Sequence, residues 1–440
     1  MKKLAALLVL YFAQGLPFGF QATALPLMLR ERGVSLQAIG FSGLLAAPWL
    51  GKAIWAPLVD RYHSARFGRR KSWIVPMQFA LALCALIAAH TDAPVALAAC
   101  VFAMNFFAAT QDIAVDALAV QWLEPQELGV GNAIQVVGYK LGMLTGGGLL
   151  VWASGFIGFH GLFQAMAALL FAVFFMSLGL NERGRDVPSQ LATAIDFSEI
   201  ARRLRTAFRK PSTRSLLAIV LTYKMGETLA EAMWKPMLVD RGFSAPQIGL
   251  WAGTYGMLFS LFGSAAAGLM LRRLPLTAAL LFSAAFRASG VAAEWWISAS
   301  GQVSAFAIIA ATCLEHLAAG ALTTVLFALM MRHTDREIGG SHYTLLSSLE
   351  VWGKMPFGLL SGVIAASCGY PGLFSIATGL CVAFSVLAFA LRDRLDLPDA
   401  PRGRDQPLPL TAAMNASTAS SVVSNEVTSR RTAGPRSGQS

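Results

Sequence analysis

Apolar runs of about 20 residues recur along most of this chain, and this feature limits the possible folds more than any other. A helix of about 20 residues is long enough to cross the hydrocarbon core of a bilayer, where the backbone must satisfy its own hydrogen bonds. The sequence therefore predicts an all-α membrane protein with twelve transmembrane helices. We place them near residues 4–29, 37–59, 73–91, 94–120, 131–154, 159–180, 214–238, 246–271, 275–298, 303–331, 341–366 and 371–391.

Charged residues are few and unevenly placed. They make up 13% of the 440 residues, whereas soluble domains carry about 25%. The net charge of +11 resides largely in loops: segments 61–71 and 183–210 are rich in Arg and Lys, while the alternate loops carry fewer, such as Arg30, Arg32 and Arg241. Basic residues mark cytoplasmic loops. We therefore expect both termini in the cytoplasm and no nucleic-acid partner.

The chain is predicted to consist of two six-helix halves. Residues 1–180 form the first half and residues 214–391 the second, with the polar, basic segment 181–213 as a cytoplasmic linker between them. Residues 392–440 are rich in Ser, Thr, Pro and Arg and poor in large apolar residues. Such a composition cannot bury enough apolar surface to fold, so we expect a disordered cytoplasmic tail.

The two halves contain a repeated sequence. MLRERGVSLQAIG at residues 28–40 matches MLVDRGFSAPQIG at residues 237–249 at seven of thirteen positions. Each copy spans the first loop of its half and the start of the next helix, so we interpret the match as an internal repeat rather than a chance similarity between loops. Two six-helix halves related in this way place a substrate site between them near the membrane midplane.

Four charged residues lie in the seventh predicted helix, namely Lys224, Glu227, Glu231 and Lys235. A charge at the centre of a membrane helix costs about 3 kcal/mol on insertion scales, so such residues should face the interior of the bundle. Their spacing of three or four residues puts them on one narrow face of a helix. We predict a cavity wall that handles protons or substrate charge, and the alternative is a ladder of structural ion pairs.

Two aspartates, Asp112 and Asp116, follow Gln111 in the fourth predicted helix and lie one turn apart. Neighbouring carboxylates raise each other's affinity for a proton, and burial adds to this effect. A carboxylate that titrates near neutral pH is what proton coupling requires. The alternative is an ion pair with a lysine, such as Lys140, that holds two helices together.

Polar stripes on further helices complete the predicted cavity. Inward-facing amides, tyrosines and lysines suit an oxygen-rich, anionic solute, although they also serve hydrogen bonding between helices. The candidate substrate-contacting residues are Tyr11, Gln14, Gln21, Gln111, Gln135, Tyr139, Lys140, Lys224, Tyr343 and Lys354. The candidate proton carriers are Asp112, Asp116, Glu227, Glu231 and Glu350. Further charged residues in predicted helices are Arg287, Glu315 and His316.

The loop after the second predicted helix combines an acid with a basic cluster. Asp60 and Arg61 end that helix, and Gly68, Arg69 and Arg70 lead into the third. We predict a gating motif, in which the acid locks the cytoplasmic helix ends in one state through the basic residues. Plain positive-inside topology would explain the arginines but would not call for the acid.

Glycines at helical spacing predict close contact between two helices. Gly15 and Gly19 lie four residues apart in the first predicted helix, and Gly142 and Gly146 repeat this spacing in the fifth. Such pairs let helix backbones approach one another in a membrane.

The chain carries no motif of an ATP-driven pump or of a membrane enzyme. We find no Walker A sequence, no zinc-ligand spacing and no nucleophile elbow. These are the motifs typical of ATP hydrolysis, zinc catalysis and serine hydrolysis, respectively. We therefore expect no enzymatic activity, no cofactor and no metal site. The expected partners are the lipid bilayer, a small-molecule substrate and protons, and we expect a monomer.

Several segments resemble one branch of a known family. WAPLVDRY followed by GRRKSW, ATQDIAVDALAV and GNAIQVVGYKLG resemble the AmpG-like permease and acetyl-coenzyme A transporter branch of the major facilitator superfamily. In the second half, LTYKMGE and HYTLLSSLEVWGK are similar to the orphan vertebrate type called major facilitator superfamily domain-containing protein 3. Siderophore importers of the RhtX/FptX type share the first-half pattern. The resemblance covers about residues 5–390 and implies the major facilitator fold.

The resemblance implies a secondary transporter of a bacterial inner membrane. We expect proton-coupled import of a bulky polar or anionic solute, such as a muropeptide or a siderophore. By resemblance, the informative segments contain Asp112, Asp116, Lys140, Glu227 and Lys354. The alternatives are an exporter or antiporter, an acetyl-coenzyme A type transporter, and a transport-dead membrane receptor or scaffold.

Overall fold

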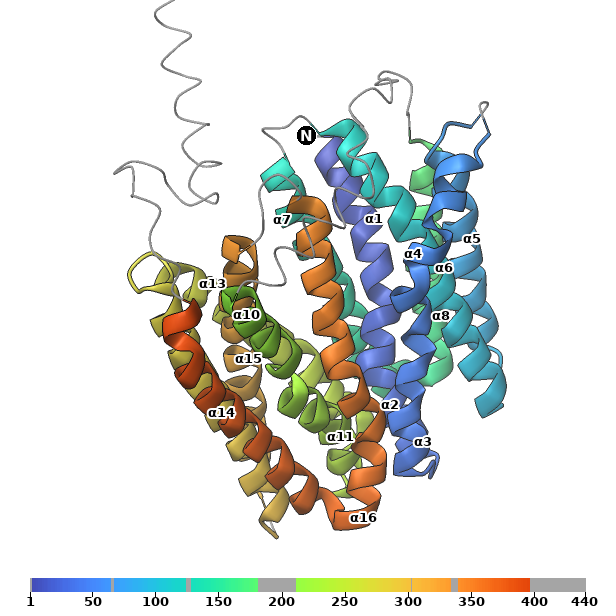
Figure 1. Ribbon diagram of the computed structural model, residues 1–440. Coiled ribbons are helices and arrows are strands. Elements are labelled where there is room, and N and C mark those ends of the chain that lie inside the picture. Colours follow the sequence, from blue (N-terminus) through green and yellow to red (C-terminus); the bar gives the residue numbers. More distant parts are fainter. Residues whose placement is uncertain are drawn as a thin grey trace, which may run out of the picture.

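The computed structural model is a bundle of helices (Figure 1). It describes residues 2–64, 67–123, 128–180, 211–301, 303–333 and 339–395. The predicted linker and tail lie almost entirely outside these residues, so their boundaries stay predictions.

The first part of the described chain, up to residue 180, alternates long helices with short helical turns. The helices are α1 (Lys2–Gly19), α2 (Leu25–Glu31), α3 (Leu36–Phe41), α4 (Ala47–Arg61), α5 (Lys71–Ala88), α6 (Pro94–Trp122), α7 (Leu128–Leu144) and α8 (Leu150–Leu178). The π-helical turns η1 (Phe20–Ala24) and η3 (Thr145–Leu149) join α1 to α2 and α7 to α8, and the 3₁₀ turn η2 (Ser42–Ala46) joins α3 to α4. Each joined pair therefore runs on without an intervening loop.

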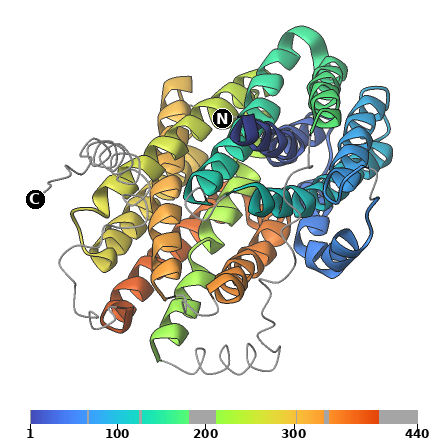
Figure 2. The ribbon, with the colours of Figure 1, turned by 90° about the horizontal axis from the view of Figure 1, so that it is seen from above.

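The second part, from residue 211, follows the same pattern. Its helices are α10 (Pro211–Thr222), α11 (Met225–Asp240), α12 (Ala245–Ile248), α13 (Gly256–Met270), α14 (Leu276–Ala299), α15 (Ala305–His333) and α16 (Gly339–Leu395), and the π-helical turn η5 (Gly249–Tyr255) joins α12 to α13. Seen from above, the first part, coloured blue to teal, and the second part, coloured green to red, lie largely on opposite sides of the molecule (Figure 2).

Seven helical segments of the described residues are long and apolar enough to cross a membrane. Two of them, Ile134–Leu178 with 45 residues and Ser348–Leu395 with 48, exceed the roughly 20 residues that one crossing needs. Each is interrupted by a glycine with positive φ, Gly158 at 69° and Gly369 at 72°, and α16 turns back at the lower end of Figure 1. The protein is thus an all-α, multi-pass membrane protein, and the count of twelve crossings stays a prediction.

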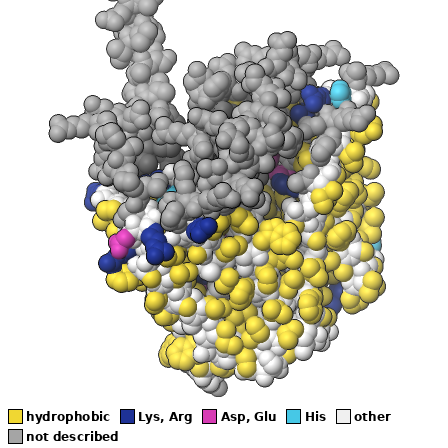
Figure 3. All heavy atoms as spheres, viewed as in Figure 1, with side chains coloured by type: hydrophobic (Ala, Val, Ile, Leu, Met, Phe, Trp, Pro, Cys, Tyr) yellow, Lys and Arg dark blue, Asp and Glu magenta, His cyan; other side chains and the backbone are white. Residues whose placement is uncertain are grey.

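Apolar side chains cover most of the visible side of the bundle, as Figure 3 shows. The Lys and Arg side chains visible there gather mainly toward the end at which the N-terminus lies. An apolar belt of this kind is what a surface in contact with lipid requires.

The repeated sequence motif adopts the same backbone conformation in both copies. Gly33 has φ 75° and Gly242 has φ 86°, a region that other residues rarely adopt. The N–H of each glycine donates to the carbonyl three residues earlier at 2.9 Å, which closes the end of the helix. Ser35 and Ser244 then occupy the N-cap of the next helix, so the shared residues specify a shared local structure.

Glycines bring α1 against α7. A Cβ atom added to Gly15 would overlap the carbonyl oxygen of Tyr139, and one added to Gly142 would overlap the carbonyl oxygen of Phe12. The two backbones can approach this closely only because both positions lack a side chain. The predicted role of these glycines is confirmed.

The more extensive contacts between the first and second parts involve α2 with α11, α3 with α16, α8 with α12, and η3 with η5. The labels of α2, α3, α11 and α16 lie toward the lower end of Figure 1, opposite the N-terminus. The described structure therefore joins its two parts chiefly at one end of the bundle.

Candidate functional site

Two carboxylates on α6 connect four helices of the first part. Asp112 forms an ion pair with Lys52 on α4. Asp116, one turn later, accepts hydrogen bonds from the Tyr11 hydroxyl on α1 at 2.8 Å and from the Gln135 amide on α7 at 3.1 Å. The structure thus gives both predicted aspartates polar partners, which offsets part of the cost of burying them.

An aromatic group lies beside this network. Phe18, Trp49 and Tyr139 have ring centroids 5.7 to 6.4 Å apart, and the ammonium of Lys52 lies 5.5 Å from the centre of a Trp49 ring. Trp49 and Tyr139 are only partly buried. Flat, half-exposed ring faces beside a charged pair provide an amphipathic surface for a ligand.

Three of the predicted cavity amides are buried against neighbouring helices. Gln14 and Gln111 are 0% exposed, and their side-chain amide atoms have no hydrogen-bond partner among the described residues. Gln21 accepts a hydrogen bond from Asn105 on α6 at 2.5 Å, and Asn105 accepts one from Trp49. In this conformation the three amides lie in helix contacts, and substrate could reach Gln14 and Gln111 only after a rearrangement.

Two lysines of the second part share one carboxylate, and a lysine of the first part lies near them. Glu350 accepts hydrogen bonds from Tyr223 and from Lys354, both at 3.0 Å, and lies 3.6 Å from the ammonium of Lys224. Lys140 on α7 lies within electrostatic range of Lys224 and forms no ion pair with a described residue. Lys140 is therefore a cation in the bundle interior that no described carboxylate pairs with.

Ion pairs along one continuous helix, the alternative to a cavity wall at this place, are present only in part. The helix is broken between Thr222 and Met225, so that Lys224 precedes α11 rather than lying within it. Among the four predicted residues, Glu231 and Lys235 form a pair along α11, at 3.9 Å. The ion pairs of Lys224 and Glu227 instead reach residues of other helices, Glu350 on α16 and Arg287 on α14.

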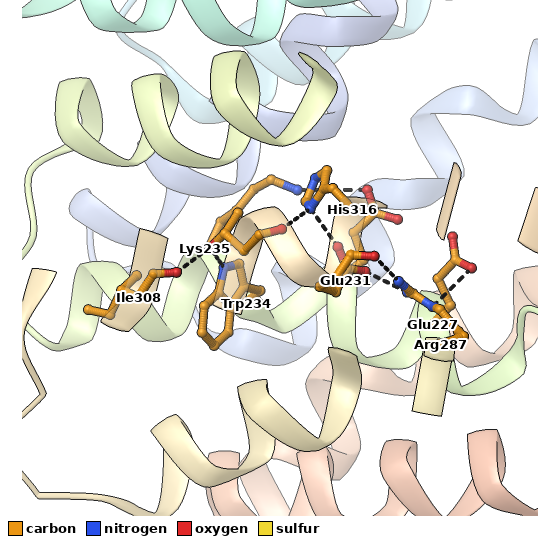
Figure 4. Close-up of polar contacts among 9 residues, drawn as sticks. Glu227, Glu231, Trp234, Lys235, Arg287, Ile308 and His316 are labelled. Atoms are coloured by element: carbon orange, nitrogen blue, oxygen red, sulfur yellow. Dashed lines mark hydrogen bonds and ion pairs between the residues drawn. The ribbon is translucent and has the colours of Figure 1, made fainter. Parts of the chain in front are cut away.

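Arg287 on α14 is the centre of a second buried cluster (Figure 4). Its guanidinium lies 3.4 Å from Glu227 Oε2 and 2.5 Å from Glu315 Oε1, and it donates a hydrogen bond to the Glu315 carbonyl at 2.7 Å. Glu315 Oε2 lies 2.5 Å from His316 Nδ1. Arg287 is 1% exposed and Glu315 is 4% exposed. Glu227 therefore pairs with Arg287 and not with Lys224.

One hydrogen bond joins α11 to α15 beside this cluster. Trp234 on α11 donates to the Thr312 hydroxyl at 3.1 Å, while His316 Nδ1 lies 3.0 Å from the Thr312 carbonyl within α15. Sequence reasoning missed Glu294, which lies two turns after Arg287 on α14 and is 1% exposed. Its spacing of seven residues from an arginine in an apolar helix is the signal that could have found it.

The basic loop between α4 and α5 is only partly described. Gly68 has φ 100°, its N–H donates to the Ser64 carbonyl at 3.1 Å, and its carbonyl accepts from the Ser72 hydroxyl at 2.5 Å. Arg69 is exposed and Arg70 is half-buried. The side chains of Asp60 and Arg61, and that of Tyr343 on α16, lie outside the described residues, so their predicted roles stay predictions.

Polar contacts tie the two parts together at the end opposite the N-terminus. Arg30 on α2 forms two hydrogen bonds to Asp240 on α11, at 2.5 and 2.7 Å, and Tyr370 on α16 donates to the same carboxylate at 2.7 Å. The N–H of Ala245 donates to Glu31 at 3.2 Å. From the sequence alone Arg30 is only a loop charge, because nothing local to it indicates a partner 210 residues away.

A multi-pass helical bundle that keeps two charged networks in its interior is typical of membrane transport proteins. A family profile described as Major Facilitator Superfamily matches residues 7–229, and the chain belongs to that superfamily, in the branch of AmpG-like permeases. It is 29% identical over 397 residues to the anhydromuropeptide permease of Escherichia coli K12, covering 89% of this chain and 80% of that protein. It is 24% identical over 398 residues to the putative transporter AmpG 4 of Rickettsia conorii, covering 88% and 96%.

Solved structures agree with this fold. The nucleoside transporter NupG matches with a TM-score of 0.67 at 13% identity, over 88% of this chain and 99% of that one. A bacterial homologue of the human lysosomal transporter Spinster, in an inward-facing and unoccupied conformation, matches with a TM-score of 0.64 at 14% identity, over 90% and 93%. The predicted family and the facilitator fold are confirmed, and the protein is a transporter rather than an enzyme.

Proposed function

We propose that this protein imports an anionic cell-wall fragment of the anhydromuropeptide kind, driven by the proton gradient across the bacterial inner membrane. The observation that carries the proposal is Lys140, which has no described ion pair and lies within electrostatic range of Lys224, beside the Lys224 and Lys354 pairs with Glu350. Uncompensated positive charge inside a membrane protein is costly unless a ligand neutralises it. An anion bound there would supply the missing charge.

The neighbouring surfaces fit the rest of such a solute. A muropeptide joins a sugar portion to a peptide with free carboxylates. The half-exposed rings of Trp49 and Tyr139 offer flat faces for the sugar, while the lysine group would bind a peptide carboxylate through charge-assisted hydrogen bonds. The printed name of the Escherichia coli relative, anhydromuropeptide permease, supports the same solute class.

The orientation in the membrane is part of this proposal. Twelve crossings in two six-helix halves, with both termini and the loop around Arg69 in the cytoplasm, agree with the positive-inside rule. The end joined by Arg30 and Asp240 then faces outward. Because the more extensive contacts between the two parts lie at that end, we assign the described conformation to the inward-facing state of a monomeric carrier.

The test is uptake by purified protein in liposomes. Labelled anhydromuropeptide should accumulate inside when an inward proton gradient is imposed, and an uncoupler should abolish accumulation. Lys140→Gln should raise the KM about tenfold, because one charge-assisted hydrogen bond contributes about 1.5 kcal/mol. An amidated anhydromuropeptide, which lacks the carboxylate charge, should be transported equally by both forms.

Three outcomes would overturn the proposal. If Lys140→Gln lost affinity equally for the charged and the amidated solute, Lys140 would not bind the carboxylate of the solute. If the solute accumulated to the same level without a proton gradient, transport would not be coupled to protons. Absence of any solute movement under either gradient direction would favour a receptor or scaffold instead of a carrier.

A further inference from the structure

The cluster around Arg287 brings carboxylates and cations of three helices together. Four carboxylates belong to it, those of Glu227, Glu231, Glu294 and Glu315, and the permanent cations that form ion pairs with them are Arg287 and Lys235. Lys224 lies within electrostatic range of Glu227 and Glu231 but not of Glu294, so the cations are unevenly shared among the four acids. Burying an uncompensated carboxylate costs several kcal/mol, and binding a proton removes that cost.

The described ion pairs indicate which acid lacks a partner. Arg287 serves Glu227 and Glu315, and Lys235 serves Glu231. Glu294 is 1% exposed, forms no described ion pair, and its Oε2 atom has no hydrogen-bond partner among the described residues. A buried carboxyl without a cation is the position at which a neutral acid is most favourable.

The packing of α14 against α15 directs Glu294 into the cluster. Gly290 lies between Arg287 and Glu294 on one face of α14, and a Cβ atom added to it would come within 2.9 Å of the Glu315 Cα atom. The backbone of Glu315 therefore packs directly against Gly290. Along α14, Arg287 precedes this contact and Glu294 follows it. Glu294 accordingly lies within electrostatic range of both Glu315 and Arg287.

We propose that Glu294 carries the coupled proton, held as a neutral carboxylic acid in the described conformation. This inference rests on the proposed proton coupling and names its carrier. In a transport cycle, the Glu294 carboxylate accepts a proton from the outer side and later releases it to the inner side, and no other bond changes.

The surroundings provide a route for that release. The groups facing Glu294 come from four helices: Arg287 on α14, Glu315 on α15, Glu231 and Lys235 on α11, and Cys381 on α16. Glu231 is the exposed member, with 48% of its side chain accessible, and it lies within electrostatic range of Lys224. A proton leaving Glu294 can thus reach the lysine-lined region through Glu231.

Two glutamine variants separate a neutral Glu294 from an ionised one. Glu294→Gln replaces an uncharged acid by an uncharged amide of nearly the same shape, so the thermal midpoint of the purified protein should not fall. Glu315→Gln on the adjacent helix removes an ionised partner of Arg287, so its midpoint should fall by several degrees. A fall in Glu294→Gln as large as that in Glu315→Gln, or failure of Glu294→Gln to fold, would overturn the proposal.

Infrared difference spectroscopy reads the proton without any substrate. The wild type should show a carboxylic-acid carbonyl band that weakens when the sample is titrated to alkaline pH, and Glu294→Gln should lack it. Glu231→Gln, as a matched change on α11, should keep it. An unchanged band in Glu294→Gln would assign the proton elsewhere. Because this measurement needs no transport, its result stays separate from a failure to move anhydromuropeptide.

Discussion

Arg287 contacts two carboxylates and a backbone carbonyl from one position on α14. A guanidinium suits this task because its donors are fixed in a plane and can serve several acceptors at once. A lysine at this position would offer a single point charge. The residue therefore controls the stability of the acid cluster on which the proposed proton coupling depends.

Arg287→Met should lower the free energy of unfolding by about 3–5 kcal/mol, because it leaves Glu227 and Glu315 buried without a cation. Arg287→Lys should recover only part of this loss. Thermal unfolding of the purified variants measures the difference. Arg214→Met is the control, since Arg214 is exposed on α10 and its loss should change little. Equal midpoints for the two methionine variants would show that the cluster does not depend on Arg287.

Helix breaks decide which charged residues meet, and they mark the limit of what the sequence could predict. Apolar periodicity predicted the helical segments, and glycine spacing predicted close packing of helices without naming the pair that meets, because both patterns are local. The partners of Glu227 and Asp112 were not predictable in this way. The break between α10 and α11 at Tyr223 and Lys224 contains no proline that would predict it from the sequence. Tertiary packing alone brings Lys52 to Asp112 and Arg287 to Glu227, and no local spacing in the sequence encodes such packing.

Gly142→Ala should destabilise the protein by about 1–3 kcal/mol, because its Cβ would overlap the Phe12 carbonyl and a backbone atom cannot turn aside. We expect less monodisperse protein after purification and a lower thermal midpoint. Gly268→Ala on α13 is the matched control, since nothing lies within 4 Å of the added Cβ. Ala favours the helix over Gly by about 1 kcal/mol, so this control should be neutral or slightly stabilising. A stable Gly142→Ala variant would mean that α1 and α7 are not in close contact.

At the scale of the whole molecule, the alternation between states depends on which end holds the two parts together. In the described conformation Asp240 receives hydrogen bonds from Arg30 of the first part and from Tyr370 of its own part. Hydrogen bonds to a charged group contribute about 1.5–3 kcal/mol each. Breaking this contact must therefore accompany any opening of that end, and its strength sets part of the balance between the states.

Asp240→Asn should shift the equilibrium toward an open outer end by about tenfold or more, because the neutral amide keeps the shape but loses the ion pair with Arg30. Spin labels at Val95→Cys and Phe306→Cys, which are 83% and 80% exposed at the starts of α6 and α15, report the separation of the two parts at this end. The labelled protein should carry serine in place of the native cysteines Cys84, Cys100, Cys313, Cys368 and Cys381. Electron–electron distance measurements should then show a longer population in the variant.

The matched control for this prediction is Asp92→Asn. Asp92 lies at the same end, 3.9 Å from Arg32 and 3.4 Å from His160, so it makes its contacts within the first part alone. Asp92→Asn should give the same distance distribution as the wild type, because this change removes no contact between the two parts. If Asp92→Asn lengthened the distances as much as Asp240→Asn, the effect would be a general loss of charge at this surface. If neither variant changed them, the glycine-mediated contact of η3 with η5 would hold the end closed without help from Arg30 and Asp240.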